Sequence, residues 1–244
     1  MRIVNKIIFW VKNILFPDSC AICGCSFISD TEIQYGFCEK CKANISPVQG
    51  QECSICGKPL ISEKDICLSC RNGAGHSYDR LWTLFPYTGI FRKLLTAYKF
   101  RKKVAIADFF TDKILAAIAA NPVLQSAVIV PVPPRPGKIK DNGWDQVDYL
   151  VRRIIKNKQS RVKISFCLKR MKSKVQKSLN RTERLENLKG RIYLHGAYSK
   201  ASTAPETVLI IDDVITTGST MEVCAFVLKD AGVKNVYGLC LFYD

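Results

Sequence analysis

The sequence predicts an α/β fold: a mainly parallel sheet flanked by helices, preceded by a zinc-ribbon module at the N-terminal end. Three apolar, strand-like runs, at residues 127–133, 208–211 and 236–242, alternate with helical patterns, as a parallel sheet buried on both faces requires. Four Cys-x-x-Cys pairs precede these runs and indicate metal binding. We therefore expect a helix and double zinc ribbon over residues 1–80 and the α/β domain over residues 81–244.

The composition is that of a globular protein with a strong positive charge. A length of 244 residues and a hydrophobic content of 48% are enough for one α/β domain with a sizeable core and a smaller module. The net charge of +16 predicts attraction to polyanions such as nucleic acid or an anionic membrane surface. The N-terminal residues have neither an uninterrupted apolar core nor a small-residue cleavage site, so we expect a cytoplasmic protein.

An amphipathic helix is predicted at the N-terminus. Apolar residues recur at helical spacing from Ile3 to Leu15, and Pro17 ends the pattern. The segment is shorter than the ~20 apolar residues that span a membrane. Such stripes usually pack on the rest of their protein, and the alternative is a peripheral contact of this basic helix with the inner face of the membrane.

Eight of the twelve cysteines form the four Cys-x-x-Cys pairs. Each pair places two thiolates on one tight turn, and two turns supply the four soft ligands that tetrahedral Zn²⁺ requires. Two structural zinc ions are predicted, because four protein ligands leave no position for a reactive water. The spacing leaves the pairing open, and disulfides in a secreted protein are the alternative. The predicted ligands are Cys20, Cys23, Cys38, Cys41, Cys53, Cys56, Cys67 and Cys70.

The other four cysteines have different sequence contexts. Cys25 lies beside Cys23 and could compete with it as a zinc ligand. Cys167, Cys224 and Cys240 lie in apolar strand-like or helical segments, which favours small core residues over reactive thiols.

The first part of the α/β domain has a strand followed by two helical patterns. Residues 81–87 are strand-like, and residues 89–100 and 104–120 carry apolar residues at helical spacing. A buried strand then enters a loop rich in proline and lysine at residues 134–142, before a predicted helix at residues 144–158.

The loop at residues 134–142 is a candidate anion site. Parallel strands joined by right-handed crossovers end on one side of the sheet, so this loop should open on the same edge as the loop after residue 211. Arg135 and Lys138 are therefore candidates for binding a second anion, such as a pyrophosphate. The alternative is that both are solvated loop cations, as most exposed lysine and arginine side chains are.

A basic segment occupies residues 161–191, which hold eleven basic residues against only two acidic ones. Residues 172–184 lack apolar periodicity, which predicts a mobile loop. Such a loop could close over a phosphorylated ligand, follow a nucleic-acid backbone, or simply be solvated.

The run from residue 208 to residue 220 is the strongest functional signal. An apolar strand ends at Asp212 and Asp213, and a loop rich in Thr, Ser and Gly leads into a helix. Hydroxyl groups and backbone N–H groups at a helix start bind phosphate, whereas the carboxylates suit hydroxyl donors or a bridging metal ion. A sugar phosphate presents both groups, and an ordinary capped turn is the alternative. The predicted anion-binding residues are Thr216, Thr217, Gly218, Ser219 and Thr220.

This run resembles the phosphoribosyl pyrophosphate (PRPP) signature of type I phosphoribosyltransferases. The resemblance implies that Asp212 and Asp213 hold the ribose hydroxyls, that the loop holds the 5′-phosphate, and that Mg²⁺ arrives with the pyrophosphate. It also implies the fold of that family for residues 81–244.

The whole chain resembles the ComF family of competence proteins. This implies a contribution to the uptake of single-stranded DNA in natural transformation, with a DNA-translocating ATPase of the competence machinery as a partner. One departure is Asn142-Gly143-Trp144-Asp145-Gln146, where the family usually has Arg-Gly-Phe-Asn-Gln. The likeness lies in the ribbons, Tyr87-Thr88-Gly89, Tyr98-Lys99-Phe100, Val130-Pro131-Val132-Pro133, Asp212–Thr220, and Arg170-x5-Gln176-x2-Leu179 with Arg184-x2-Asn187.

The sequence favours a binding protein over an enzyme. No segment resembles a hood that selects a nucleobase, and His76 and His195 lie in contexts where histidine is more often structural than catalytic. We expect a PRPP-binding, phosphoribosyltransferase-like protein that works in DNA uptake. Phosphoribosyl transfer to an unidentified acceptor is the alternative.

Overall fold

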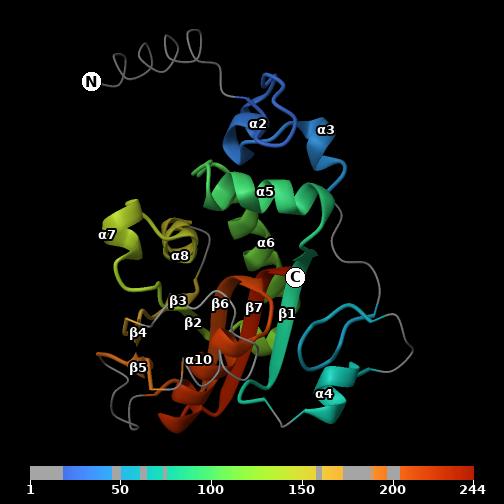
Figure 1. Cartoon of the computed structure of the whole chain (residues 1–244). Helices are drawn as coiled ribbons and strands as arrows, with labels where there is room; N and C mark the ends of the chain where they lie inside the picture. Colours follow the sequence, from blue (N-terminus) through green and yellow to red (C-terminus); the bar gives the residue numbers. More distant parts are fainter. Residues whose placement is uncertain are drawn as a thin grey trace. The chain divides into compact units, whose positions relative to one another are not determined.

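The structure is a computed structural model of the 244-residue chain, shown in Figure 1. The predicted N-terminal helix and the predicted mobile loop from residue 173 onward lie outside the described residues, as do Gln176, Leu179, Arg184 and Asn187. The structure describes residues 19–45, 51–60, 65–73, 76–157, 161–172, 188, 190–196 and 204–244.

The described elements follow the predicted alternation of strands and helices. In chain order they are α2 (Asp30–Tyr35), α3 (Glu39–Lys42), α4 (Leu68–Asn72), β1 (Arg80–Pro86), α5 (Gly89–Lys99), α6 (Ile106–Ala120), the 3₁₀ helix η1 (Pro122–Leu124), β2 (Val128–Pro131), α7 (Lys138–Asn142), α8 (Gln146–Lys156), β3 (Lys163–Ile164), β4 (Leu168–Arg170), β5 (Ile192–Leu194), β6 (Thr207–Ile215), α10 (Ser219–Asp230) and β7 (Asn235–Tyr243).

A five-stranded parallel sheet confirms the predicted fold class. Its strand order is β1-β7-β6-β2-β3, so β6 lies in the centre between β7 and β2 (Figure 1). Val208 and Ile210 of β6 join the core cluster that includes Met221 and Cys224 of α10. Leu209 and Ile211 alternate to the other face and are also fully buried, so both faces of β6 are covered.

Two local predictions differ from the structure, and one pair of strands was not predicted. The central strand does not end before the acidic pair: β6 continues to Ile215, because β7 stays paired with it up to Tyr243. The predicted loop at residues 134–142 contains the short helix α7. The small antiparallel pair β4–β5 lacked a clear sequence pattern, since each strand has only three residues.

The chain divides by its internal contacts into two compact units. The first comprises residues 1–46 and 88–110, and the second comprises residues 47–87 and 111–244. The two zinc ribbons therefore belong to different units, and the second ribbon groups with the sheet. The domain boundary predicted after residue 80 stays a prediction.

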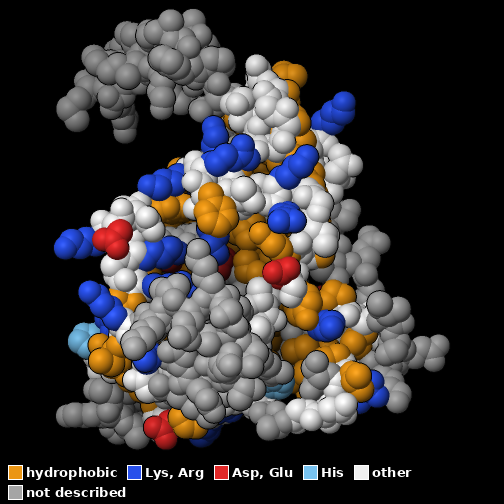
Figure 2. Space-filling model, in the orientation of Figure 1, with side chains coloured by type: hydrophobic (Ala, Val, Ile, Leu, Met, Phe, Trp, Pro, Cys, Tyr) orange, Lys and Arg blue, Asp and Glu red, His pale blue; other side chains and the backbone are white. Residues whose placement is uncertain are grey.

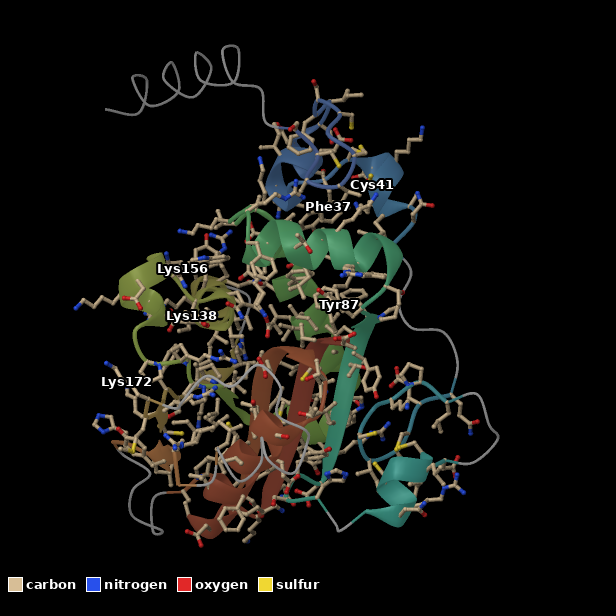
Figure 3. All side chains as sticks on the ribbon, in the orientation of Figure 1. Phe37, Cys41, Tyr87, Lys138, Lys156 and Lys172 are labelled. Carbon is tan, nitrogen blue, oxygen red and sulfur yellow. The ribbon has the colours of Figure 1, made fainter. Side chains whose placement is uncertain are left out.

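The first unit contains the ribbon around Phe37 and Cys41, which Figure 3 labels. Phe37 is buried and meets the ring of Phe109 edge-on, with the ring centroids 5.0 Å apart. The guanidinium of Arg101 donates to the carbonyl of Ala21 at 2.7 Å. This unit thus has its own small apolar core and a hydrogen bond across it.

In the second unit, the second ribbon covers the free edge of β1. The N–H of Leu81 donates to the carbonyl of Ile55 at 2.8 Å, and the hydroxyl of Thr83 donates to the carbonyl of Gly57 at 3.0 Å. An uncovered edge strand would present unpaired backbone groups to other chains. The ribbon therefore completes the sheet at this edge.

Positive charge dominates the surface that Figure 2 shows, where lysine and arginine side chains are far more widespread than acidic ones. This distribution agrees with the net charge of +16. Among the described helices, none is both long enough and apolar enough to cross a membrane.

The contact between the second ribbon and β1 predicts that Gly57→Ala destabilises the protein. Gly57 has a φ of 66°, and a Cβ there would lie 2.6 Å from the carbonyl oxygen of Leu81. We expect a cost of about 3 kcal/mol, from left-handed strain of about 1–2 kcal/mol and an overpacking term of similar size. Urea unfolding measures the change.

Gly24→Ala is the matched control. Gly24 occupies the corresponding turn of the first ribbon with a φ of 81°, but a Cβ there meets no atom within 4 Å. This variant should lose only the strain term. Equal losses at the two positions would contradict the close contact with β1.

Candidate functional site

The phosphate loop, defined here as residues 216–220, lies between β6 and α10. Gly218 is the N-cap residue of α10, with a φ of 73°, and no side chain caps this helix start. The first intrahelical N–H bond is from Glu222 to the carbonyl of Gly218 at 2.9 Å. The N–H groups that precede Glu222 in the first turn therefore have no partner within the helix, which is the arrangement that binds an anion.

Side chains add polar groups to the phosphate loop. The hydroxyls of Thr217 and Ser219 are 3.0 Å apart, so they can orient each other. A cavity of ≈ 40 Å³ opens at this position. It is far smaller than the roughly 300–1,000 Å³ of a typical small-molecule pocket, so it suits one compact group such as a phosphate. Its lining includes all five predicted loop residues together with Asp212.

The structure places the two predicted carboxylates in different environments. Asp212 is half-buried and lines the phosphate cavity. Asp213 is buried, with 6% of its surface exposed, and does not line the cavity. Its carboxylate accepts a hydrogen bond from the side chain of Gln146 at 2.7 Å and another from the N–H of Val214 at 3.0 Å. Only Asp212 shares a cavity with the phosphate loop.

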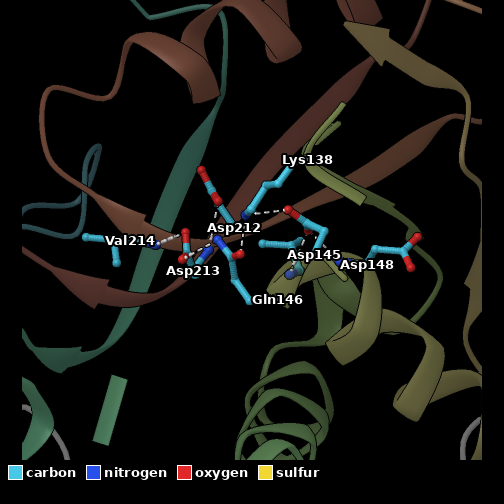
Figure 4. A network of polar contacts seen from close by, with 8 residues as sticks. Lys138, Asp145, Gln146, Asp148, Asp212, Asp213 and Val214 are labelled. Carbon is cyan, nitrogen blue, oxygen red and sulfur yellow. Dashed lines mark hydrogen bonds and ion pairs between the residues drawn. The ribbon is translucent and has the colours of Figure 1, made fainter. Parts of the chain in front are cut away.

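A polar network connects Asp213 to the loop after β2, as Figure 4 shows. The ammonium of Lys138 contacts the carboxylate of Asp145 at 2.6 Å and also the amide oxygen of Gln146. Asp145 is 4% exposed and caps α8 by accepting from the N–H groups of Val147 and Asp148. Lys138, a predicted anion ligand, is thus held by the acid that departs from the ComF pattern.

Arg135 is exposed, and a second arginine, Arg170, lies close enough to affect it electrostatically. Burial and the charge of Arg135 lower the pKa of Arg170, whereas Asp212 acts in the opposite direction. The Nε of Arg170 is buried and has no hydrogen-bond partner in the described part of the chain. The sequence predicted no ligand for Arg170, although Arg170 begins one of the motifs that resemble the ComF family.

The first ribbon differs from the prediction, because Cys25 and not Cys41 completes its cluster of four sulfur atoms. The sulfur atoms of Cys20, Cys23, Cys25 and Cys38 all lie within 4.8 Å of one another. Cys41, the predicted fourth ligand, is buried, and its N–H donates to the Cys38 sulfur at 3.4 Å. Burial raises the pKa of Cys41, and contacts with the thiols of Cys23, Cys38 and Cys20 raise it further. Cys25 therefore belongs to the cluster of four, and Cys41 lies beside it.

The second ribbon contains the predicted tetrad Cys53, Cys56, Cys67 and Cys70, whose sulfur atoms also lie within 4.8 Å of one another. The sulfurs of Cys56 and Cys67 are 3.7 Å apart. Two thiolates on one tetrahedral zinc, with Zn–S bonds of about 2.3 Å, are about 3.8 Å apart, so the geometry fits zinc. The cysteines of each cluster come from one contiguous ribbon, which favours sequential over interleaved pairing.

Within the second tetrad, burial raises the pKa of Cys56 to about 11 and also raises that of Cys70, whereas Cys53 differs from both. Burial raises the pKa of the Cys53 thiol, but backbone N–H groups of Cys56, Cys67 and Ile55 outweigh it and lower the pKa to about 6. The thiolate is the form that binds zinc. Two tetrads of this kind support two structural zinc ions.

The three remaining cysteines are buried, which confirms them as core residues. Burial raises the pKa of Cys167, Cys224 and Cys240, which disfavours their reactive thiolate forms.

Comparisons with known proteins agree with this arrangement. A double zinc ribbon domain matches residues 11–71. The chain is 26% identical to competence protein ComFC of Streptococcus pneumoniae, over 82% of this chain and 84% of that protein. It is 26% identical to competence protein F of Haemophilus influenzae, over 82% and 87%. It is 24% identical to DNA utilization protein YhgH of Escherichia coli, over 84% and 96%. These matches confirm the resemblance to ComF proteins along most of the chain.

The two tetrads predict about two zinc ions per chain by metal analysis, following four thiolates per site. Cys41→Ser should lower this to about one, because Cys41 occupies the position in the first ribbon that Cys70 occupies in the second. Cys25→Ser should leave the zinc content unchanged, and it serves as the matched control. Loss of zinc from Cys25→Ser but not from Cys41→Ser would assign the fourth ligand to Cys25.

Proposed function

We propose that this protein binds PRPP at the end of β6, with the 5′-phosphate in the phosphate loop. The observation that carries this proposal is the start of α10, where Gly218 leaves the first-turn N–H groups uncapped beside the hydroxyls of Thr217 and Ser219. Asp212 lines the same cavity, so an acceptor of hydroxyl hydrogen bonds lies next to a phosphate site. A ribose 5-phosphate presents this pair of groups.

The roles of the two carboxylates follow from their environments. Asp212 would accept a hydrogen bond from a ribose hydroxyl. Asp213, held by Gln146 and the N–H of Val214, would fix the end of β6 and add negative charge nearby. Mg²⁺ brought with the pyrophosphate would neutralise phosphate charge, and oxygen ligands such as these carboxylates suit that ion.

The pyrophosphate would bind Arg135 and Arg170. Arg135 is exposed, and the Nε donor of Arg170 is unpaired among the described residues. Lys138 would contribute less, because its charge is balanced by Asp145. The departure from the ComF pattern therefore has a physical consequence. Asp145 pairs with Lys138, so the positive charge of Lys138 is less available to an anion.

The named relatives extend the proposal to competence. Two are called competence proteins and one a DNA utilization protein, and each matches more than four-fifths of this chain. We propose that this protein contributes to the uptake of single-stranded DNA in natural transformation from the cytoplasm. A DNA-translocating ATPase is the proposed protein partner, and a peripheral membrane contact through the N-terminal segment is part of the same proposal.

Phosphoribosyl transfer to an unidentified acceptor is the second candidate function. It would use the same PRPP site, and one observation favours it: a cavity of ≈ 190 Å³ adjoins Thr216 and Thr217 and could admit a further group. Among the described residues, no histidine lines the phosphate cavity, whereas His76 lines the adjoining one. Release of pyrophosphate that requires an added acceptor would establish transfer.

Thr217→Asp should abolish PRPP binding, because it places a carboxylate where the phosphate binds. Thr217→Ser, which keeps the hydroxyl, should bind within about threefold of the unmodified protein, as a small change in a single hydrogen bond allows. Calorimetry with PRPP and Mg²⁺ measures both. PRPP binding by Thr217→Asp at unchanged affinity would refute this site.

Binding of single-stranded DNA should weaken steeply as salt rises, because neutralising phosphates releases counterions. Fluorescence anisotropy of a labelled oligonucleotide at several salt concentrations gives the slope. Lys172→Ala should lower the slope by about one if this residue contacts a phosphate. A response to salt that is flat would instead favour a protein partner as the main contact.

A further inference from the structure

His76 joins the second zinc site to the helix that follows the phosphate loop. Its Nε2 is 3.5 Å from the sulfur of Cys70, and its Nδ1 is 3.2 Å from a carboxylate oxygen of Glu222. The ring stacks on Tyr78, a buried residue, with the centroids 4.6 Å apart and the planes 21° apart. Tyr78 thus restricts the orientation of the imidazole between its two partners.

Glu222 is held by more than this one contact. Its other carboxylate oxygen accepts from the N–H of Ser77 at 2.8 Å and from the Ser77 hydroxyl at 2.6 Å. Burial raises the pKa of Glu222, but the hydrogen bonds from His76 and Ser77 outweigh it and lower the pKa. A charged carboxylate with these donors is a fixed anchor for α10.

Glu222 lies in the first turn of α10, and its backbone N–H bonds to the carbonyl of Gly218. A chain of direct contacts therefore runs from the Cys70 sulfur through His76 and Glu222 to the phosphate loop. The cavity of ≈ 190 Å³ independently shows that the two sites are close, because its lining includes Cys70 and His76 together with Thr217 and Gly218.

We propose that His76 and Glu222 are positioning residues that couple the second zinc site to the phosphate loop. Cys70 and the other three thiolates would hold zinc, which would fix the turn that carries Cys70. His76 then holds Glu222, and the first turn of α10 is kept ready for an anion. A loop already ordered in this way loses less conformational entropy on binding. Coupling of this kind is reciprocal, so a bound phosphate ligand changes the zinc affinity of the second site by the same factor by which zinc changes the phosphate affinity.

This inference rests on the proposed phosphate site, and the variants Glu222→Gln and His76→Ala test it. Each should bind PRPP about five- to tenfold more weakly, within the range typical of coupling between sites. The zinc content should stay at about two per chain, because all the thiolate ligands remain. Calorimetry and metal analysis give the two readouts.

Lys229→Ala is the matched control on the same helix. Lys229 ties the other end of α10 to Asp79, at 2.9 and 3.1 Å, and its removal should leave the PRPP affinity unchanged. An equal loss in Lys229→Ala would show that any loosening of α10 weakens binding, and it would overturn the special role of His76 and Glu222.

A spectroscopic measurement distinguishes coupling between the two sites from a purely structural contribution of Glu222 to α10. With Co²⁺ in place of zinc, the absorption bands of the thiolate-bound metal report on both sites, and a Cys41→Ser background, which should keep metal at the second site alone, isolates the bands of that site. Saturating PRPP should shift these bands in the unmodified protein and leave them unchanged in Glu222→Gln. Unchanged bands in the unmodified protein, or unchanged PRPP affinity in both variants, would overturn the inference.

Inorganic phosphate distinguishes failure of this inference from failure of the PRPP proposal. Phosphate binding that depends on Glu222, without PRPP binding, would support the coupling and refute the proposed ligand. PRPP binding that is independent of His76 and Glu222 would do the reverse. Binding of neither ligand would refute both.

Discussion

The change of backbone direction at Gly218 is the constraint on which the site depends. β6 is buried on both faces and can end only where its neighbours stop pairing, at Ile215 beside Tyr243. A left-handed residue then turns the chain into α10 without a capping side chain. N–H groups at a helix start have no acceptor within the helix itself, so this turn can present them to an anion. The carboxylate of Asp212 is fixed beside this position by the same strand.

The second zinc ribbon lies next to both the sheet and the phosphate loop, although it precedes them in the chain. It covers the edge of β1 through Leu81 and Thr83, and its cysteines share a cavity with the phosphate loop. A zinc ion with four thiolates carries a net negative charge, which by itself would disfavour a phosphate nearby. Lys58 lines the same cavity, and its ammonium group supplies positive charge and hydrogen-bond donors there. The ribbon is thus part of the electrostatic environment of the proposed ligand.

The features that sequence reasoning predicted are local ones. The zinc tetrads, β6, the phosphate loop and α10 each show their identity within a few consecutive residues, because spacing and periodicity carry the signal. The contacts that the sequence did not reveal join distant residues. Gln146 reaches Asp213 across 67 positions, and His76 reaches Glu222 across 146. Such side-chain contacts depend on how the elements pack, which no local pattern encodes. The short α7 and β4 were missed because so few residues give no period.

The central claim is that a phosphorylated sugar binds where β6 meets α10. Hydrogen exchange of backbone amides, followed by mass spectrometry with and without PRPP and Mg²⁺, tests it directly, since the ligand should pair with the amides themselves. The account predicts slower exchange in peptides covering residues 212–222, with little change in peptides covering the first ribbon at residues 19–45. Unchanged exchange across residues 212–222 at saturating PRPP, or protection confined to another part of the chain, would contradict it.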